Sequence, residues 1–324
     1  MNSISKRKNF SPWNLTVDTY WVDFKASIFF VVIFLLTLFL FLNASSGKSF
    51  DVQDSVLNKK KITLITASIG VGYTASMVTL SELWYKKNPQ SPFHFFNDND
   101  EWLQMDKLGH TTTSFQESWF LVQSLQWTGL STKKAIWFGS FAGLAFQTPI
   151  EILDGFSSAY GASWGDELAN TTGSLGVLTQ YLVWNEIRIK PKYSFHQSNY
   201  AGIRPAELGS SLAEEWLKDY NGQSYWLSFN MWSFFKASKI PKWINLSFGY
   251  GGENMIFAAH SENLFHGYHS YRQYYLSFDL DFSSMKIKNK WLRAITYPLN
   301  FVHIPFPTLE YNAHQGIIFH GIYF

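Results

Sequence analysis

The pattern of apolar and polar positions changes near residue 188, and this change predicts the fold class. Before that point, apolar residues recur with helical spacing in four stretches, 62–84, 106–126, 135–153 and 166–186. From residue 225 on, apolar residues alternate with small or polar ones in 225–231, 244–250 and 274–282, as in strands with one apolar face. We therefore expect an α+β chain, with an N-terminal bundle of about four helices followed by an antiparallel β-sheet or partial barrel.

Two arrangements of the β region fit this alternation. One is a half-buried sheet that covers the helices, and the other is a lipid-facing barrel wall. The chain ends in GIIFHGIYF, and a terminal aromatic such as Phe324 is typical of the last strand of outer-membrane barrels. The pattern contains only four or five clear strands, whereas single-chain barrels have at least about eight. The covering sheet is therefore favoured.

An uncharged apolar run, ASIFFVVIFLLTLFLFLN, covers residues 26–43 and follows several basic residues. It is long for the core of a signal peptide and short for a membrane-spanning helix. It predicts a cleaved signal peptide or an uncleaved anchor, and either one exports the rest of the chain. The expected organisation is an N-terminal extension with this segment (1–46), a helical bundle domain (47–190), a linker with a short helix (191–222) and an antiparallel β region (223–324).

Composition favours a membrane or envelope setting over the cytosol. Aromatic residues make up 19% of the chain and charged residues 15%, well below the roughly 25% charged residues of soluble domains. Trp and Tyr concentrate where one end of a side chain is dry and the other wet. The net charge is +2, and no basic cluster or phosphate-binding motif in the sequence indicates a nucleic acid or dinucleotide partner.

The stretch MDKLGHTTTSFQESW, residues 105–119, places acidic groups and an imidazole on one face of an otherwise apolar helix. Polar pairs also occur where the third helix ends and where the fourth begins, each spaced three or four residues apart. In an up-down bundle, these positions and the start of the second helix lie at the same end. We therefore expect a cluster formed by Asp106, His110, Glu117, Glu151, Asp154, Asp166 and Asn170.

Two hypotheses account for this cluster. Several carboxylates in an apolar site cannot all stay ionised without compensation, so one hypothesis is a divalent metal bound by His110, Glu151, Asp154 and Asp166. Such oxygen-rich ligation suits Mg, Mn or Ca better than Zn. The other hypothesis is a metal-free hydrogen-bond network that fixes helix register. It is slightly favoured because the spacing matches no known ligand signature, and no catalytic residue is assigned.

Other polar residues are interpreted as structural. His196 and Arg204 are expected to tether loops, and Asp279 and Asp281 to face solvent or the helical domain. Three further histidines, His303, His314 and His320, have no clustered partners in the sequence.

Several spaced blocks resemble a known family. DKLGH (106–110), EILDGFSSAYGASWGDELANTTGS (151–174), YSFHQSNYA (193–201), RPAELGS (204–210) and LKDYNGQSYWLS (217–228) are similar to the YfiM-like family of bacterial envelope lipoproteins, a domain of unknown function, in its longer Bacteroidota-type form. The resemblance implies an exported envelope protein and supplies no reaction. The sequence departs from the lipoprotein members because it contains no cysteine to carry a lipid. A fainter similarity to VanZ-like membrane proteins is an analogy of fold.

Two functions are compatible with these observations, and whether the protein is an enzyme stays open. The first is an uncharacterised envelope protein of a Gram-negative bacterium, in the periplasm or at the outer membrane, with a structural or accessory role and with membrane lipid or envelope proteins as partners. The alternative is a membrane-proximal, metal-dependent hydrolase that acts on a lipid or a cell-wall precursor through the Asp/His/Glu cluster. A proton-coupled transport role is a weaker third hypothesis, because it requires helices that span a bilayer.

Overall fold

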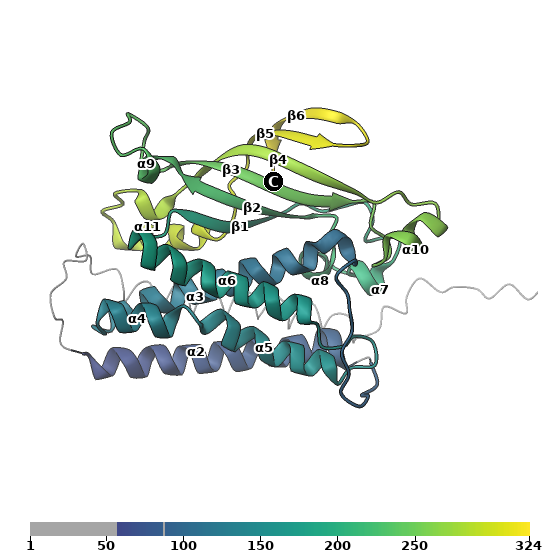
Figure 1. The fold of residues 1–324 in the computed structure, drawn as a ribbon, viewed down its shortest axis with the longest axis horizontal. Coiled ribbons are helices and arrows are strands. Elements are labelled where there is room, and N and C mark those ends of the chain that lie inside the picture. Colours follow the sequence, from purple (N-terminus) through teal and green to yellow (C-terminus); the bar gives the residue numbers. More distant parts are fainter. Residues whose placement is uncertain (1–56, 87) are drawn as a thin grey trace, which may run out of the picture.

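The computed structural model of this chain describes residues 57–86 and 88–324 (Figure 1). The apolar run 26–43 and the whole predicted segment 1–46 lie outside the described residues. Within them, the chain forms a helical layer followed by a six-stranded sheet, which confirms the predicted α+β class. Figure 1 shows the helices stacked on one side, with β1 the strand nearest to them.

The predicted helices are present, with one division. They are α2 (Lys59–Leu80), which continues as a π-helical turn (Ser81–Tyr85), α3 (Met105–Trp127) and α6 (Trp164–Trp184). The expected third helix, 135–153, is two helices, α4 (Thr132–Gly139) and α5 (Ala142–Gly155). Among the described helices, α2 is long and apolar enough to cross a membrane, a property that core helices and signal sequences share.

The break between α4 and α5 lies against α3 and α6, and serines of these two helices supply its hydrogen bonds. A helix begins with backbone N–H groups that have no partner within the helix. In α5, the Gly143 N–H donates to Ser118 Oγ at 2.9 Å and the Leu144 N–H donates to Ser174 Oγ at 2.9 Å. A Cβ at Gly143 would lie 2.0 Å from the Ser114 carbonyl oxygen. Glycine there lets α5 start directly against α3.

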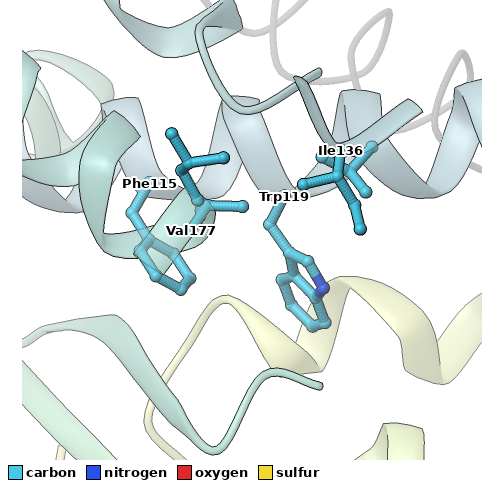
Figure 2. Close-up of a cluster of buried hydrophobic side chains, with 6 residues drawn as sticks. Phe115, Trp119, Ile136 and Val177 are labelled. Carbon is cyan, nitrogen blue, oxygen red and sulfur yellow. The ribbon is translucent and has the colours of Figure 1, made fainter. Parts of the chain in front are cut away.

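An apolar cluster holds the bundle together on the other side of these serines. Figure 2 shows Phe115 and Trp119 of α3 beside Ile136 of α4 and Val177 of α6. All four are at least nine-tenths buried. Burial of a large apolar side chain stabilises a fold by roughly 1.5–3 kcal/mol, so this cluster is a main anchor between α3, α4 and α6.

The C-terminal half consists of six strands in sequence order, each antiparallel to the next. Short helices lie between them. The elements are β1 (Ile189–Phe195), α7 (Pro205–Leu208), α8 (Leu212–Lys218), β2 (Gln223–Asn230), α9 (Met231–Phe234), β3 (Ile244–Glu253), α10 (His260–Phe265), β4 (Tyr271–Leu280), a 3₁₀ turn (Phe282–Ser284), α11 (Lys290–Thr296), a second 3₁₀ turn (Tyr297–Asn300), β5 (Phe306–Asn312) and β6 (Gly316–Tyr323). The strand β1 lies at the start of the segment predicted as a linker.

The two faces of the sheet are reversed relative to those of an ordinary covering sheet, whose apolar face is buried and whose polar face is exposed. One rung of paired outward residues crosses β2 to β6 and is apolar and exposed throughout: Leu227, Phe248, Leu276, Leu309 and Phe319. The opposite face is buried and carries many polar side chains beside the aromatic cluster of Trp226, Tyr275 and Tyr323. The polar residues include Ser228, Asn245, Ser247, Ser277, Asp279, Thr308 and Glu310. The helix α3 covers the part of the apolar face at Tyr193 and Tyr225. The expected burial of the apolar face against the helices is therefore confined to that part.

The polar face is buried because the sheet curls around it. Lys192 of β1 contacts Asp279 of β4 at 2.6 Å, and Lys190 contacts Asp281 at 2.6 Å. In a flat sheet, β1 and β4 would lie about 14 Å apart, which is too far for these pairs. The expectation that Asp279 and Asp281 face solvent or the helical domain is wrong, since both are at least 98% buried inside the curve.

Candidate functional site

A strained turn positions the first residues of the candidate site. The three residues before α3, Trp102, Leu103 and Gln104, all have positive φ angles, between 48° and 66°. Non-glycine residues rarely adopt this conformation. The turn is held by a hydrogen bond from the Trp102 N–H to the Ala258 carbonyl at 2.8 Å and by one from the Tyr250 hydroxyl to the Leu103 carbonyl at 2.6 Å. The β region thus fixes where α3 begins, and with it Asp106 and His110.

The imidazole of His110 is the centre of the site. Its Nδ1 lies 3.0 Å from Asn170 Oδ1, an acceptor, so Nδ1 donates this hydrogen bond and Nε2 is the ring nitrogen that faces the acidic groups. Nε2 faces three carboxylate oxygens, at 3.7 Å from Glu151 and at 3.9 Å from Asp106 and from Asp166. None of these distances is a hydrogen bond. The Nε2 atom and three acidic groups therefore lie around one small space, and none of the three carboxylates is hydrogen-bonded to Nε2.

The spacing of these atoms fits the ligands of a cation. Donors about 2.1 Å from Mg²⁺ lie about 3.0 Å apart when neighbouring and about 4.2 Å apart when opposite. The distances from His110 Nε2 fall inside that range, and donor atoms of Asp106, His110 and Asp166 all lie within 4.8 Å of one another. Glu151 is 95% buried, and its Oε1 has no hydrogen-bond partner among the described residues. The hydrogen bond from Nδ1 to Asn170 Oδ1 fixes the orientation of the imidazole, as outer partners do for ligating histidines.

Lys107 partly neutralises the acidic groups. Its Nζ lies 2.7 Å from Asp166 Oδ1, 2.8 Å from Asp98 and 3.4 Å from Asp106. Burial favours its neutral form, but Asp106 and Asp166 outweigh this and raise its pKa. The same region contains several carboxyl groups, among them those of Asp98, Asp106, Glu151, Asp154 and Asp166. One lysine cannot balance them all, so the remaining carboxyls need protons or another cation.

The carboxyl pKa values reflect this shortage of positive charge. Burial raises the pKa of Glu151 to about 8 and that of Asp154 to about 6. Burial and the charge of Asp106 raise the pKa of Asp166 to about 9. Burial also acts against the ionised form of Asp106, but His110, Lys107 and a 2.6 Å hydrogen bond from the Tyr220 hydroxyl hold its pKa below the usual value. Such opposed pKa shifts within one cleft are a feature of functional sites.

The structure brings most of the predicted cluster together. Asp106, Glu151 and Asp166 surround His110, and Asn170 orients it. Asp154 lies at a cavity wall, where it accepts a 2.8 Å hydrogen bond from the Tyr85 hydroxyl. Glu117 lies two turns further along α3 and accepts a 2.9 Å hydrogen bond from Gln147.

Sequence reasoning missed Asp98, Lys107 and Tyr220. Lys107 adjoins Asp106 in the sequence, which is a usable signal, but the other two come from a loop and from the turn before β2. All three histidines that have no clustered partners in the sequence have contacts, and the ring of His314 lies 5.2 Å from that of Tyr271. His320 Nε2 lies 2.7 Å from Glu310 Oε2, and His303 stacks on Trp226 at 3.8 Å.

A cavity of about 1000 Å³ opens above the cluster, between the helices and the sheet. Asp106, His110, Asp154 and Asp166 line it on one side. Aromatic side chains form much of the remaining wall, and they include Trp84, Trp102, Tyr160, Trp216, Tyr225 and Phe301. A cavity of this size with mostly apolar walls and a few convergent polar groups is typical of a small-molecule site. The cluster is therefore accessible, rather than sealed in a dry seam between helices.

Comparison with known proteins places this site inside a recognised segment. Residues 94–182 match the model of a family described as predicted periplasmic lipoprotein (DUF2279). This segment contains every residue of the predicted cluster, together with Asp98 and Lys107. No curated protein and no solved structure matches the chain. The match supports a protein of the cell envelope or periplasm.

Proposed function

We propose that this protein binds a divalent cation between Asp106, His110, Glu151 and Asp166 and uses it to hydrolyse an amphiphilic substrate. The observation that carries this proposal is the arrangement at His110, where Nε2 faces carboxylate oxygens of three acidic residues at 3.7–3.9 Å. Asp106 takes the place that the sequence hypothesis gave to Asp154. A bound divalent cation lowers the pKa of its water ligand and polarises an ester or phosphoryl oxygen.

The cavity indicates the class of substrate. Its aromatic wall would bind an apolar body, while the cation would bind an anionic or carbonyl-containing head. A lipid or a cell-wall precursor combines these two parts. Asp154, with a pKa raised to about 6 and a position on the cavity wall, is placed to exchange a proton with a bound head group.

The test uses the purified full chain and two substitutions. Metal content is measured after dialysis against Mg²⁺, Mn²⁺, Ca²⁺ and Zn²⁺ in turn, for wild type, His110→Ala and Asp166→Asn. Glu117→Gln is the matched control, since Glu117 is also a buried carboxyl on α3 but is bonded to Gln147. We expect about one ion per chain in wild type and in the control, and a strong loss in the two site variants. Equal metal content in all four proteins would refute the site.

Hydrolysis is tested separately on loaded protein. Medium-chain esters and phosphoesters of p-nitrophenol report turnover, and the expected result is activity that chelation removes and that His110→Ala lacks. Binding of the cation without turnover of any such substrate would retain the metal site and refute the hydrolase.

A second candidate is a structural or accessory role at the outer membrane, and the reversed faces of the sheet favour it. An apolar outer face over a polar, hydrogen-bonded inner face is the arrangement of an outer-membrane barrel wall. Under this proposal the protein is the longer, Bacteroidota-type form of the YfiM-like family, seated in the envelope of a Gram-negative bacterium. Recovery of both wild type and His110→Ala in the outer-membrane fraction would favour this candidate. Recovery in the cytosol would contradict both candidates.

A further inference from the structure

Exposed lysines gather at one end of the molecule, although they are scattered in the sequence. They lie at the start of α2, the start of α4, the segment from α9 to β3, and the segment that leads into α11, all on the left in Figure 1. Contacts link two of these parts to their neighbours: the Asn58 N–H before α2 donates to the Thr128 carbonyl before α4, and Lys236 lies 3.6 Å from Glu186, which follows α6. We call this surface the basic end. Its exposed members are Lys59, Lys60, Lys133, Lys134, Lys236, Lys239, Lys242, Lys286, Lys288 and Lys290.

Large apolar side chains are exposed among these lysines. The segments 231–243 and 282–296 contain six lysines and Arg293, and they contain no Asp or Glu. The same two segments expose Phe234, Phe235, Trp243, Trp291, Leu292 and Ile295 by 38–57%. On the short helix α11, three of these lie together beside Lys290. Lysines flanking exposed Trp, Leu and Ile are typical of surfaces that lie in a membrane interface.

The opposite end of the molecule is acidic. The loop before α3 carries Asp98, Asp100 and Glu101, and the start of α3 and the end of α5 add Asp106 and Asp154. Because α3 has 23 residues, the two ends lie about 34 Å apart along it. Positive charge is therefore concentrated at one end of the helices and negative charge at the other, so a negatively charged surface would attract the basic end.

We propose that the basic end binds a bilayer that contains anionic phospholipids, with Trp291, Leu292 and Ile295 in the head-group region. The lysines are complementary to lipid phosphates, and the exposed apolar groups distinguish a bilayer from a soluble polyanion, which would leave them in water. The apolar outer face of the sheet is continuous with this end through β3 and β4. Bound in this way, the protein holds the acidic cluster about 30 Å from the head groups.

The absence of cysteine from the sequence allows a direct test on the full chain. One cysteine is introduced at Ile295, in the basic end, or at Phe265 on α10, at the opposite end; the two side chains are 53% and 85% exposed. Each variant is labelled with an environment-sensitive dye and mixed with vesicles of phosphatidylcholine alone or with about 30% phosphatidylglycerol. We expect a blue shift of the dye at residue 295 with the anionic vesicles, which 300 mM NaCl reduces, and no shift at residue 265.

Charge variants complete the test. Lys239→Glu/Lys288→Glu, made in the residue-295 variant, is expected to weaken binding to anionic vesicles about tenfold or more. The matched control, Lys86→Glu/Arg272→Glu, changes the same charge outside the basic end and is expected to change binding less than about threefold. Equal shifts at residues 265 and 295, equal binding to both vesicle types, or equal losses in the two charge variants would each overturn the proposal. So would an equal shift with soluble polyglutamate, which would instead indicate an acidic protein partner.

Discussion

Replacement of Lys192 by methionine should destabilise the protein strongly, because it leaves a buried charge without its partner. Lys192 and Asp279 are both completely buried and lie 2.6 Å apart, and Lys192 Nζ also donates to the Leu280 carbonyl at 2.8 Å. Breaking such a pair by removing one partner costs about 3–5 kcal/mol, whereas replacing both partners with apolar groups is often close to neutral. We therefore expect Lys192→Met to lower the free energy of unfolding by about 3–5 kcal/mol, and Lys192→Met/Asp279→Leu to restore most of it.

Urea denaturation followed by tryptophan fluorescence measures these free energies. The matched control is Lys86→Met, which removes a lysine from an ion pair of similar length, 2.7 Å to Glu82, in which Lys86 is 66% exposed. The control should cost less than about 1 kcal/mol, since exposed ion pairs contribute little. If Lys192→Met and Lys86→Met cost the same, or if the double variant is less stable than Lys192→Met, the account of the curved sheet as a shell around buried ion pairs is wrong.

Three further predictions concern the sheet, the bundle and the site. Burial lowers the pKa of His303 to about 4, so the unfolded state binds the proton more tightly than the folded state. The neutral His303 therefore contributes fully to stability above about pH 6.5, and up to about 3 kcal/mol of the free energy of unfolding is lost as pH falls toward 4. His303→Leu should flatten this dependence of the unfolding free energy on pH, as measured by denaturation at several pH values. Gly143→Val should lower the thermal midpoint by several degrees, because its Cβ would clash with the Ser114 carbonyl. Gly267→Val is the comparison: φ is positive there and nothing lies within 4 Å, so this variant tests backbone strain without a clash. Asn170→Ala should weaken cation binding about 10–100-fold without abolishing it, as measured by calorimetric titration, because Asn170 orients His110 and is not itself a ligand.

The helical spacing predicted the bundle and the approach of its polar pairs for a simple reason. Residues three or four apart share a helix face, and up-down order places Asp106, Glu151 and Asp166 at one end of the bundle. Cation binding by these residues stays a prediction, since their geometry alone does not show that an ion binds. The position of Lys107 beside Asp106 was a usable signal, but its contacts with Asp98 and Asp166 could not be predicted, because they depend on how a loop and α6 fold against α3.

The face of the sheet that is buried could not be predicted from alternation. A period of two separates two faces, but it does not say which face turns toward the protein. Lys190 and Lys192 interrupt the apolar pattern of β1, and their burial depends on Asp281 and Asp279, about 90 residues further along the chain. Gly249 offers a partial signal, because a Cβ there would lie 2.6 Å from the Trp226 ring, which occupies the inner face.

The measurement that tests the central proposal most directly is a titration of the full chain with Mn²⁺, followed by the electron paramagnetic resonance signal of the free ion. If His110 and its three carboxylates form a cation site, wild type and Glu117→Gln will each remove about one ion per chain from solution. His110→Ala and Asp166→Asn will remove little at the same concentrations. Free Mn²⁺ that rises identically with all four proteins would contradict the proposal and leave the cluster as a hydrogen-bond network between helices.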